Sequence, residues 1–413
     1  MSRRVVVTGI GAVTPLGNDI STTWKRLIQG EDAAAPVTLF DTSGCRCKIA
    51  ASVQVPEVQS KKKSRFSRAS RLAISAAQQA LEQACLLTRE GESQFPWLRI
   101  SVSSTAGGMA LGEAFVRNLK RKNQSDLPLV KKVKGNREGQ LFRASHYQAQ
   151  AQILDLHTHF NFQGPITIIA NACASGANAI GHAADLIRSG VAECVLTGGY
   201  EELTELLYVG FDSLQALSID RCRPFDQNRS GLMLGEAAGF LVLESEEHAR
   251  KRQASILCEL AGYGHSTDLH HLTQPNPSGE ALIQATNMAL SEAKVPLEHV
   301  GYLNAHGTGT TLNDASECLA FQHVFGSSSS FRLSSTKAAI GHTLGAAGAI
   351  EAIFSIQALL SGEMPPQIHL QKPEPQVASC LVRAGETNPN LKAVMSTNLG
   401  FGGSNAALVF TKI

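Results

Sequence analysis

The chain has 413 residues, of which 43% are hydrophobic and 17% charged, and its formal net charge at pH 7 is +2. This length predicts two domains or one duplicated architecture, and the composition is that of an ordinary compact protein. The small net charge gives no support for nucleic acid as the main partner. The most apolar long stretch, residues 338–360, contains His342, Glu351 and several glycines, so we expect no membrane span.

Cysteine usage points to a reducing compartment. Nine cysteines are scattered along the chain without a CxxC pair, which argues against a disulfide framework and favours the cytoplasm. Cys45-x-Cys47 and His157-x-His159 are close pairs of ligand-type residues in the sequence. Neither pair has a second half at the spacing of a zinc site, so we expect no metal cofactor.

Strands and helices alternate in the first part of the chain. The pattern predicts strands over 4–8, 98–103, 165–170, 191–199 and 238–243, and helices over 70–83 and 177–189. The turn after the first strand, Gly9-Ile10-Gly11, has Thr14 where a dinucleotide-binding loop needs its third glycine, and Pro15 follows. We therefore exclude a nicotinamide or flavin cofactor. Residues 117–160 are polar and basic, and the pattern assigns no element there.

The same rhythm restarts near residue 255. It predicts strands over 256–260, 300–304, 332–335, 394–397 and 406–411, and helices over 279–293, 314–325 and 346–360. Alternating strands and helices favour a layered α/β fold with buried, largely parallel sheets. The restart predicts two related halves, residues 1–250 and 251–413.

One candidate nucleophile stands between a predicted strand and a predicted helix, in the stretch Asn171-Ala172-Cys173-Ala174-Ser175-Gly176. A sulfur at the amino end of a helix meets partial positive charge, which favours thiolate over thiol. The alternative is a buried structural cysteine, the commoner role of a lone free cysteine. Residues elsewhere in the chain must decide between the two.

Three loops in the second half follow predicted strands and carry polar residues. They contain His306, Lys337 with His342, and the glycine-rich segment 398–405. Ligand sites of α/β folds lie at the carboxyl ends of strands, so we expect these loops and Cys173 to line one pocket. Each loop alone is more typical of a structural histidine or a simple turn than of a site. Together they supply a nucleophile, two imidazoles, a lysine and backbone N–H groups for an oxyanion.

These motifs closely resemble one family. NACASG, NAHGTGT, SSTKAAIGH, GHTLGAAGAIEA and NLGFGGSNAALVF are similar to the β-ketoacyl-acyl carrier protein synthases of the elongating type, which have a Cys-His-His triad. VVVTGIGAVTPLG and RPFDQNRSGLMLGEAAG extend the resemblance over nearly the whole chain. The resemblance implies a duplicated thiolase-like fold, layered as an α/β/α/β/α sandwich, and a dimer as the working unit.

The resemblance also implies the role of each triad residue. Cys173 would carry the acyl thioester. His306 and His342 would flank a malonyl unit, promote its decarboxylation and stabilise the resulting enolate, a charge that two N–H donors in a dry pocket stabilise better than water does. The backbone N–H groups of Cys173 and Phe401 would form an oxyanion hole, and Phe401 would gate the acyl pocket. Plain core packing is the alternative for Phe401.

Further residues would support this chemistry by the same resemblance. Thr308 and Thr310 would hydrogen-bond the pantetheine arm of the carrier. Lys337, with Asp314 and Glu317 nearby, would hold a charge network around the histidines.

The carrier itself would be the main partner. The resemblance implies acyl and malonyl units delivered on the phosphopantetheine arm of acyl carrier protein, with no other cofactor. Carrier proteins of this system are acidic, so Arg65 and Arg68 in the basic stretch 61–71 are candidate docking residues. The resemblance implies a homodimer, or a heterodimer with a related ketosynthase or chain-length factor.

Other functions fit the sequence less well. Ser334-x-x-Lys337 matches the nucleophile pattern of penicillin-binding acyltransferases, but the chain has no KTG element. A thiolase would use a second cysteine as base, and a non-catalytic chain-length factor would lack the active cysteine. The pathway stays open between fatty acid and type II polyketide or polyene synthesis, because segments 117–134, 145–148 and 270–277 depart from the common fatty-acid pattern.

Overall fold

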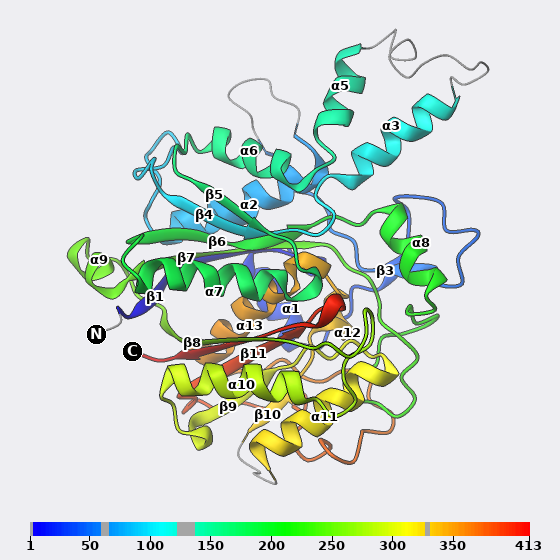
Figure 1. Ribbon diagram of the computed structural model, residues 1–413, viewed down its shortest axis with the longest axis vertical. Helices are drawn as coiled ribbons and strands as arrows, with labels where there is room; N and C mark the ends of the chain where they lie inside the picture. Colours follow the sequence, from blue (N-terminus) through cyan, green and yellow to red (C-terminus); the bar gives the residue numbers. More distant parts are fainter. Residues whose placement is uncertain (1–2, 59–65, 122–136, 327–330) are drawn as a thin grey trace.

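Long apolar runs form the central strands. A computed structural model describes residues 3–58, 66–121, 137–326 and 331–413. β1 (Val5–Val13) is buried at every position, as expected for a strand covered on both faces. Within the described residues, ten strands join in the order β10-β9-β11-β12-β8-β1-β7-β6-β4-β5 (Figure 1). The other nine are β4 (Arg99–Ser103), β5 (Ile166–Ile169), β6 (Cys194–Glu201), β7 (Ala237–Ser245), β8 (Cys258–Thr267), β9 (Val300–Asn304), β10 (Arg332–Ser334), β11 (Ala393–Leu399) and β12 (Ser404–Thr411).

The strand order shows that the fold is duplicated. The first five strands of this sheet in chain order lie as β5-β4-β6-β7-β1, and the last five lie as β10-β9-β11-β12-β8. When the five strands of each half are counted along the chain, both halves have the same spatial order: third, second, fourth, fifth, first. β1 and β8, the first strand of each half, pair with each other where the halves meet. The restart in the sequence pattern is confirmed by this repeat.

The prediction of largely parallel sheets is wrong. Among the described strands, β4 pairs in parallel with β5 and β6, and β9 pairs in parallel with β10 and β11. The remaining five pairings of the sheet are antiparallel. The reason is that the fourth and fifth strands of each half run in opposite directions, and the first strand pairs antiparallel with the fifth. Buried antiparallel strands are as apolar as parallel ones when helices cover both faces, so the sequence pattern did not distinguish them.

Helices complete a sandwich of five layers (Figure 1). α2 (Arg68–Gln83) and α6 (Ala149–His159) cover the outer side of the first half, and α10 (Glu280–Ala293) and α11 (Thr311–Phe325) cover that of the second. α7 (Ser175–Arg188) and α13 (Ala347–Ser361) pack against each other between the two halves and contact strands of both. The largest apolar cluster includes residues of both central helices, which places the core between the halves.

One apolar helical stretch, Leu344–Ser361, is long enough to cross a membrane, but 83% of it is buried. It contains α13, so its apolar character is explained by its central position in the core.

Two further helices project from the body of the molecule. α3 (Met109–Arg121), which begins before the unassigned region 117–160, and α5 (Arg137–Ser145), which lies inside it, project away from the sheet (Figure 1). The other short elements are α1 (Ile20–Ile28), β2 (Ala35–Pro36), β3 (Ile49–Ala50), α8 (Glu205–Ser213), α9 (Glu246–Lys251) and α12 (Lys337–Ile340).

Candidate active site

Cys173 lies on a tight turn between β5 and α7, as the sequence predicts. Ala172 adopts the left-handed backbone conformation, with φ 58°, which is strained for a residue with a Cβ. The Ser175 hydroxyl holds this turn, because it accepts from the Asn171 N–H at 2.8 Å and donates to the Ala172 carbonyl at 2.5 Å. The turn thus places the buried Cys173 side chain at the amino end of α7.

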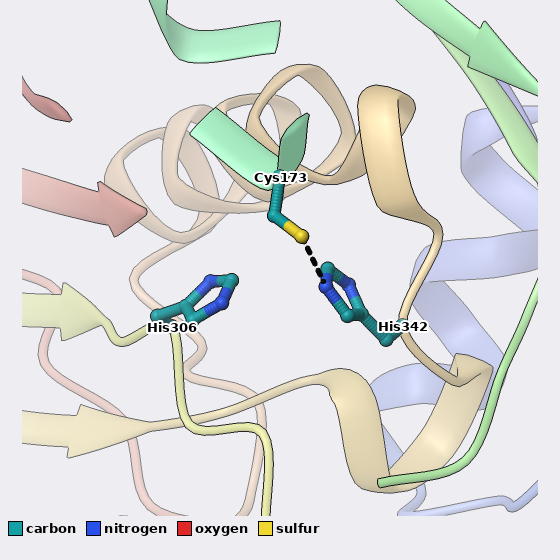
Figure 2. A group of neighbouring side chains, drawn as sticks. All are labelled: Cys173, His306 and His342. Atoms are coloured by element: carbon teal, nitrogen blue, oxygen red, sulfur yellow. Dashed lines mark hydrogen bonds between the residues drawn. The ribbon is translucent and has the colours of Figure 1, made fainter. Parts of the chain in front are cut away.

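Two imidazole rings from the second half face this sulfur (Figure 2). His306 follows β9, and His342 follows α12. His342 Nε2 lies 2.9 Å from Cys173 Sγ, and the two rings meet edge to face with their centroids 5.2 Å apart. One possible ligand atom from each of the three side chains lies within 4.8 Å of the others. The structure therefore assembles a buried Cys-His-His triad from both halves.

Burial sets the protonation of the triad. It raises the pKa of the Cys173 thiol to about 12, against the opposing effects of the Lys337 charge and of a hydrogen bond from the Phe401 N–H. Burial, followed by the Lys337 charge, lowers the pKa of His306 and of His342 well below the usual range. At neutral pH the site holds a thiol beside two neutral imidazoles. The expectation of a resting thiolate is wrong, because desolvation outweighs the favourable charges around the sulfur.

Phe401 lies in the loop between β11 and β12. Its backbone N–H lies close enough to the Cys173 sulfur to lower the pKa of that thiol. Its ring is 38% exposed and stacks on Phe211 of α8, with centroids 5.7 Å apart. The loop turns through Gly402, whose φ of 81° suits glycine, and the Gly402 N–H donates to the Leu272 carbonyl at 2.7 Å. Phe401 is therefore not a core residue and stands at the edge of the site.

A pocket of about 420 Å³ joins these residues. Cys173, His306, His342 and Phe401 all line it, as do the two threonines predicted to contact the substrate arm. The hydroxyls of these threonines, Thr308 and Thr310, lie 2.9 Å from each other. Most of the other lining residues come from segments 211–216, 230–232, 271–275 and 311–313, and from 399–405.

Two buried carboxyls of α11 shape the loop that carries His306. Glu317 accepts from the backbone N–H groups of His306 at 2.8 Å and Gly307 at 2.6 Å. Asp314 accepts from the Gly309 N–H at 3.1 Å. Burial, followed by the Asp314 charge, raises the pKa of Glu317 to about 8. These groups therefore act on His306 through its backbone.

Lys337 has a different principal partner from the one expected. It forms a buried ion pair with Glu351 of α13, and the other oxygen of Glu351 accepts from the Asn398 side chain at 2.6 Å. The charge of Lys337 also lowers the pKa of Glu317, so its field reaches α11. Sequence reasoning missed Glu351 and Asn398 as members of the site. The available signal was an acidic residue within the apolar stretch 338–360.

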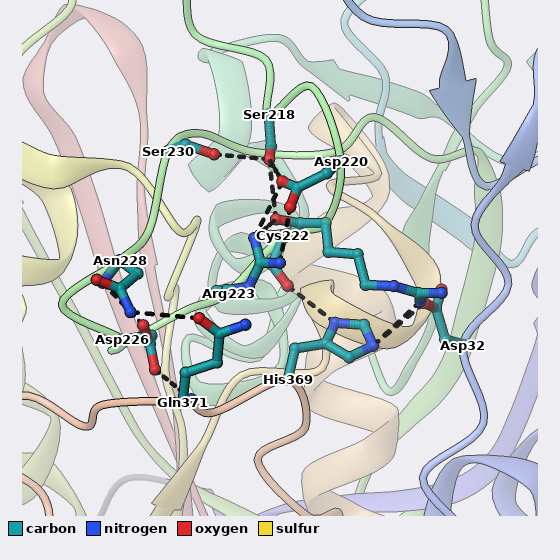
Figure 3. A network of polar contacts seen from close by, with 11 residues as sticks. Asp32, Ser218, Asp220, Cys222, Arg223, Asp226, Asn228, Ser230, His369 and Gln371 are labelled. Carbon is teal, nitrogen blue, oxygen red and sulfur yellow. Dashed lines mark hydrogen bonds and ion pairs between the residues drawn. The ribbon is translucent and has the colours of Figure 1, made fainter.

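Polar contacts hold the loop that forms one wall of the pocket (Figure 3). The hydroxyl of Ser218 lies 2.8 Å from that of Ser230, which lines the pocket. Arg221 pairs with Asp32, whose carboxylate also lies 3.2 Å from His369 Nε2. These contacts tie the pocket wall to the amino-terminal segment and to the segment after α13.

The two candidate docking residues have different outcomes. Arg65 lies outside the described residues. Arg68 starts α2, where its guanidinium pairs with the fully buried Glu236 and donates to the Val53 carbonyl at 2.6 Å. These contacts direct Arg68 into the protein and favour a structural role for it over docking.

Among the residues that the structure describes, the triad is the group of His, Cys, Asp or Glu side chains whose ligand atoms lie close enough together to share a metal ion. One thiol and two imidazoles suit Zn²⁺, which in catalytic sites takes three protein ligands and one open position. The expectation that the protein has no metal cofactor stays a prediction.

Comparisons with known proteins agree with this geometry. The model of the beta-ketoacyl synthase N-terminal domain matches residues 2–249, and that of the C-terminal domain matches residues 257–371. The 3-oxoacyl-(acyl-carrier-protein) synthase 2 of Staphylococcus aureus is 35% identical over 100% of this chain and 99% of its own length. The enzyme of the same name from Synechocystis is 33% identical, over 99% of this chain and 98% of its own.

Solved structures give the same result. The ishigamide ketosynthase/chain length factor superposes with a TM-score of 0.88 at 30% identity, and a beta-ketoacyl synthase from Burkholderia phymatum with 0.86 at 31%. In both cases the match covers 100% of each chain. The chain therefore belongs to the β-ketoacyl synthase family, the acyltransferases that carry out β-ketoacyl-acyl carrier protein condensation.

Proposed function

We propose that Cys173 accepts the acyl chain and that His306 and His342 drive decarboxylation of the malonyl unit that extends it. The observation that carries this proposal is the buried triad at one pocket, with His342 Nε2 at 2.9 Å from the Cys173 sulfur. In this proposal, residues 1–250 supply the nucleophile and residues 251–413 supply both histidines. Such a site performs acyl transfer and decarboxylation in turn.

Acylation requires the Cys173 proton to leave as the sulfur–carbon bond forms. The thiol is protonated at neutral pH because burial raises its pKa. The neutral imidazole of His342 accepts the proton through Nε2 and returns it to the departing thiol of the carrier. The carbonyl oxygen becomes negative in this step, and the N–H groups of Cys173 and Phe401 stabilise it. Support for the second donor is that the Phe401 backbone N–H is near enough to lower the pKa of the Cys173 thiol.

Decarboxylation then uses both imidazoles as neutral donors. Loss of carbon dioxide leaves an electron pair on the α-carbon, delocalised as an enolate onto the thioester oxygen. Two N–H groups, one from His306 and one from His342, which now acts as its Nε2–H tautomer, stabilise this oxygen in a pocket that largely excludes water. The α-carbon attacks the acyl carbonyl and expels Cys173 as a thiolate, which takes up a proton. Neutral rings suit this step, because each retains an N–H whatever the pH near neutrality.

Supporting residues have defined places in this scheme. Lys337 sets the field at the triad, because its charge lowers the pKa of all three groups. Thr308 and Thr310 bind the pantetheine arm through their hydroxyls. Phe401 is the gate in this scheme, since it lines the pocket and is partly exposed.

The partner in the proposal is acyl carrier protein, loaded with either acyl or malonyl groups. One solved relative is a type II polyketide acyl-carrier protein in complex with its ketosynthase, with a TM-score of 0.87 at 26% identity. Another relative is a ketosynthase in complex with its chain length factor. We propose that this chain is the catalytic member of a homodimer or of such a heterodimer, because it retains the whole triad. Its nine free cysteines favour the cytoplasm.

Intact-mass spectrometry tests the first step. Incubation with acyl carrier protein should add one acyl mass to the wild-type chain and none to Cys173→Ala. Acylation that persists in Cys173→Ala would refute the assignment. Carrier proteins bearing saturated, unsaturated and aryl chains, compared for condensation product, would then distinguish a fatty-acid from a polyketide substrate.

A further inference from the structure

The oxyanion hole in the proposed function needs two donors from different halves of the chain. The Cys173 N–H belongs to the turn before α7, and the Phe401 N–H belongs to the loop before β12. Acyl transfer depends on a fixed spacing between these donors, because a donor displaced by about 1 Å loses most of its effect on the transition state. The contacts that join the two segments therefore set this spacing.

Ser404, the first residue of β12, makes this connection with its hydroxyl. Its Oγ accepts from the side-chain amide of Asn171 at 2.9 Å and from that of Asn178 at 3.2 Å. Asn171 begins the turn that carries Cys173. The hydroxyl is thus a hub between the nucleophile turn and the Phe401 loop.

The hub is anchored on the nucleophile side. Asn178 lies on α7, the helix that begins beside Cys173, and its Oδ1 accepts from the Tyr263 hydroxyl at 2.8 Å. Tyr263 is on β8, whose end pairs Thr267 with Ser404. Both amides that meet the hydroxyl are therefore fixed relative to the sulfur.

The hub is equally fixed on the Phe401 side. The carbonyl of Ser404 accepts from the Gly400 N–H at 2.7 Å, which closes the loop around Phe401. Gly400 packs directly on the nucleophile turn, since a Cβ there would lie 3.1 Å from the Asn171 carbonyl and 3.2 Å from the Ala174 nitrogen. Any shift of Ser404 is therefore passed to the Phe401 N–H.

We propose that Ser404 and Asn171 are positioning residues that set the spacing of the two oxyanion donors. This inference rests on the proposed function, because it assumes that Cys173 is acylated. Neither side chain lines the triad pocket among the described residues, so neither touches the reacting atoms there. The enolate formed by decarboxylation is held by the histidines, which do not contact the hub. The hub therefore serves acyl transfer and not decarboxylation.

The test compares two partial reactions in the full-length enzyme. Ser404→Ala should slow acylation of Cys173 from acyl carrier protein about 10- to 100-fold, by the cost of a misplaced group. The loss should appear in the maximal rate and not in the carrier concentration at half-maximal rate. Carbon dioxide release from malonyl carrier protein should stay within about twofold of wild type. Asn171→Ala should act in the same direction, and Ser404→Thr, which keeps the hydroxyl, should restore acylation.

Ser266→Ala is the matched control. Ser266 lines the same side cavity of about 360 Å³ as Ser404, but its hydroxyl bonds the Ala281 carbonyl and not Asn171. Its acylation rate should equal that of wild type. Wild-type acylation in Ser404→Ala, an equal loss of both partial reactions, or failure of the threonine variant to recover would each overturn the inference. Wild-type enzyme that takes up no acyl group on Cys173 would instead refute the proposed function.

Discussion

Removal of the buried Lys337 charge tests two roles of the Lys337–Glu351 ion pair separately: its contribution to stability and its effect on the ionisation of Cys173. Lys337 and Glu351 are both almost fully buried and pair with each other. Lys337→Met removes the cation and leaves the Glu351 carboxylate with only the Asn398 amide as a hydrogen-bonding side chain. Breaking a buried pair in this way destabilises a protein by about 3–5 kcal/mol, because one charge remains desolvated without its counterion.

The loss should depend on pH. Burial already raises the pKa of Glu351 against the opposing charge of Lys337, so the variant raises it further. A carboxyl with a raised pKa in the folded state favours folding while it is protonated, and this contribution is lost as the pH rises through the folded-state pKa. The destabilisation by Lys337→Met should therefore be largest at neutral to alkaline pH and smaller in acid. Urea unfolding followed by circular dichroism at several pH values measures it.

The double variant Lys337→Met with Glu351→Gln supplies the control. Neither charge is then buried alone, so most of the lost stability should return. The thiol of Cys173 should remain harder to ionise than in wild type, because the lost Lys337 charge lowers its pKa more than the lost Glu351 charge raises it. A double variant no more stable than Lys337→Met would refute the reasoning on burial, and wild-type alkylation kinetics at Cys173 would refute the reasoning on charge.

Three further outcomes follow from the protonation and geometry of the triad. Alkylation of Cys173 by iodoacetamide, followed by mass spectrometry, should accelerate with pH and not level off below pH 10, because the thiol pKa is about 12. A plateau of the alkylation rate near pH 8.5 would contradict this. Carbon dioxide release from malonyl carrier protein should be nearly constant from pH 8 to pH 6, because the lowered pKa values keep His306 and His342 neutral; a fall centred near pH 6.5 would refute it. Zn²⁺ should inhibit the enzyme, and a chelator should restore activity, because the three ligand atoms lie within 4.8 Å of one another. Cd²⁺ bound to the same ligands should give a thiolate absorption band, and absence of this band with the wild-type enzyme would contradict the expectation.

The layered fold could be predicted because the apolar pattern is strong in strands whose two faces are both covered by helices. The restart near residue 255 corresponds to β8, the first strand of the repeated order. Strand direction could not be predicted, because burial and not direction sets the composition of a central strand. Segment 117–160 gave no pattern. Within it, α5 projects from the body, where no core face imposes a periodic apolar stripe, whereas α6 packs against α2 and its periodicity was missed.

The positions of the triad residues could be predicted from motifs, but their protonation could not. The amino end of α7 suggested a thiolate at Cys173, whereas burial of the sulfur keeps it a thiol. Burial depends on residues from the whole chain, so a local motif does not reveal it. Ser404 was missed for a related reason, since its partner Asn171 lies far away in sequence. Glu351 was missed although Lys337 is only 14 residues away, because a single acidic residue in an apolar stretch does not show which cation it faces.

The central claim is a division of labour between Cys173 and the histidines. The most direct test is His306→Ala, assayed in parallel for self-acylation and for carbon dioxide release from malonyl carrier protein. Carbon dioxide release should fall about 10²- to 10³-fold, the usual cost of one lost oxyanion donor. Acylation of Cys173 should stay near the wild-type rate, because the proton acceptor at 2.9 Å is His342. Equal loss of both activities, or loss of acylation alone, would contradict the account.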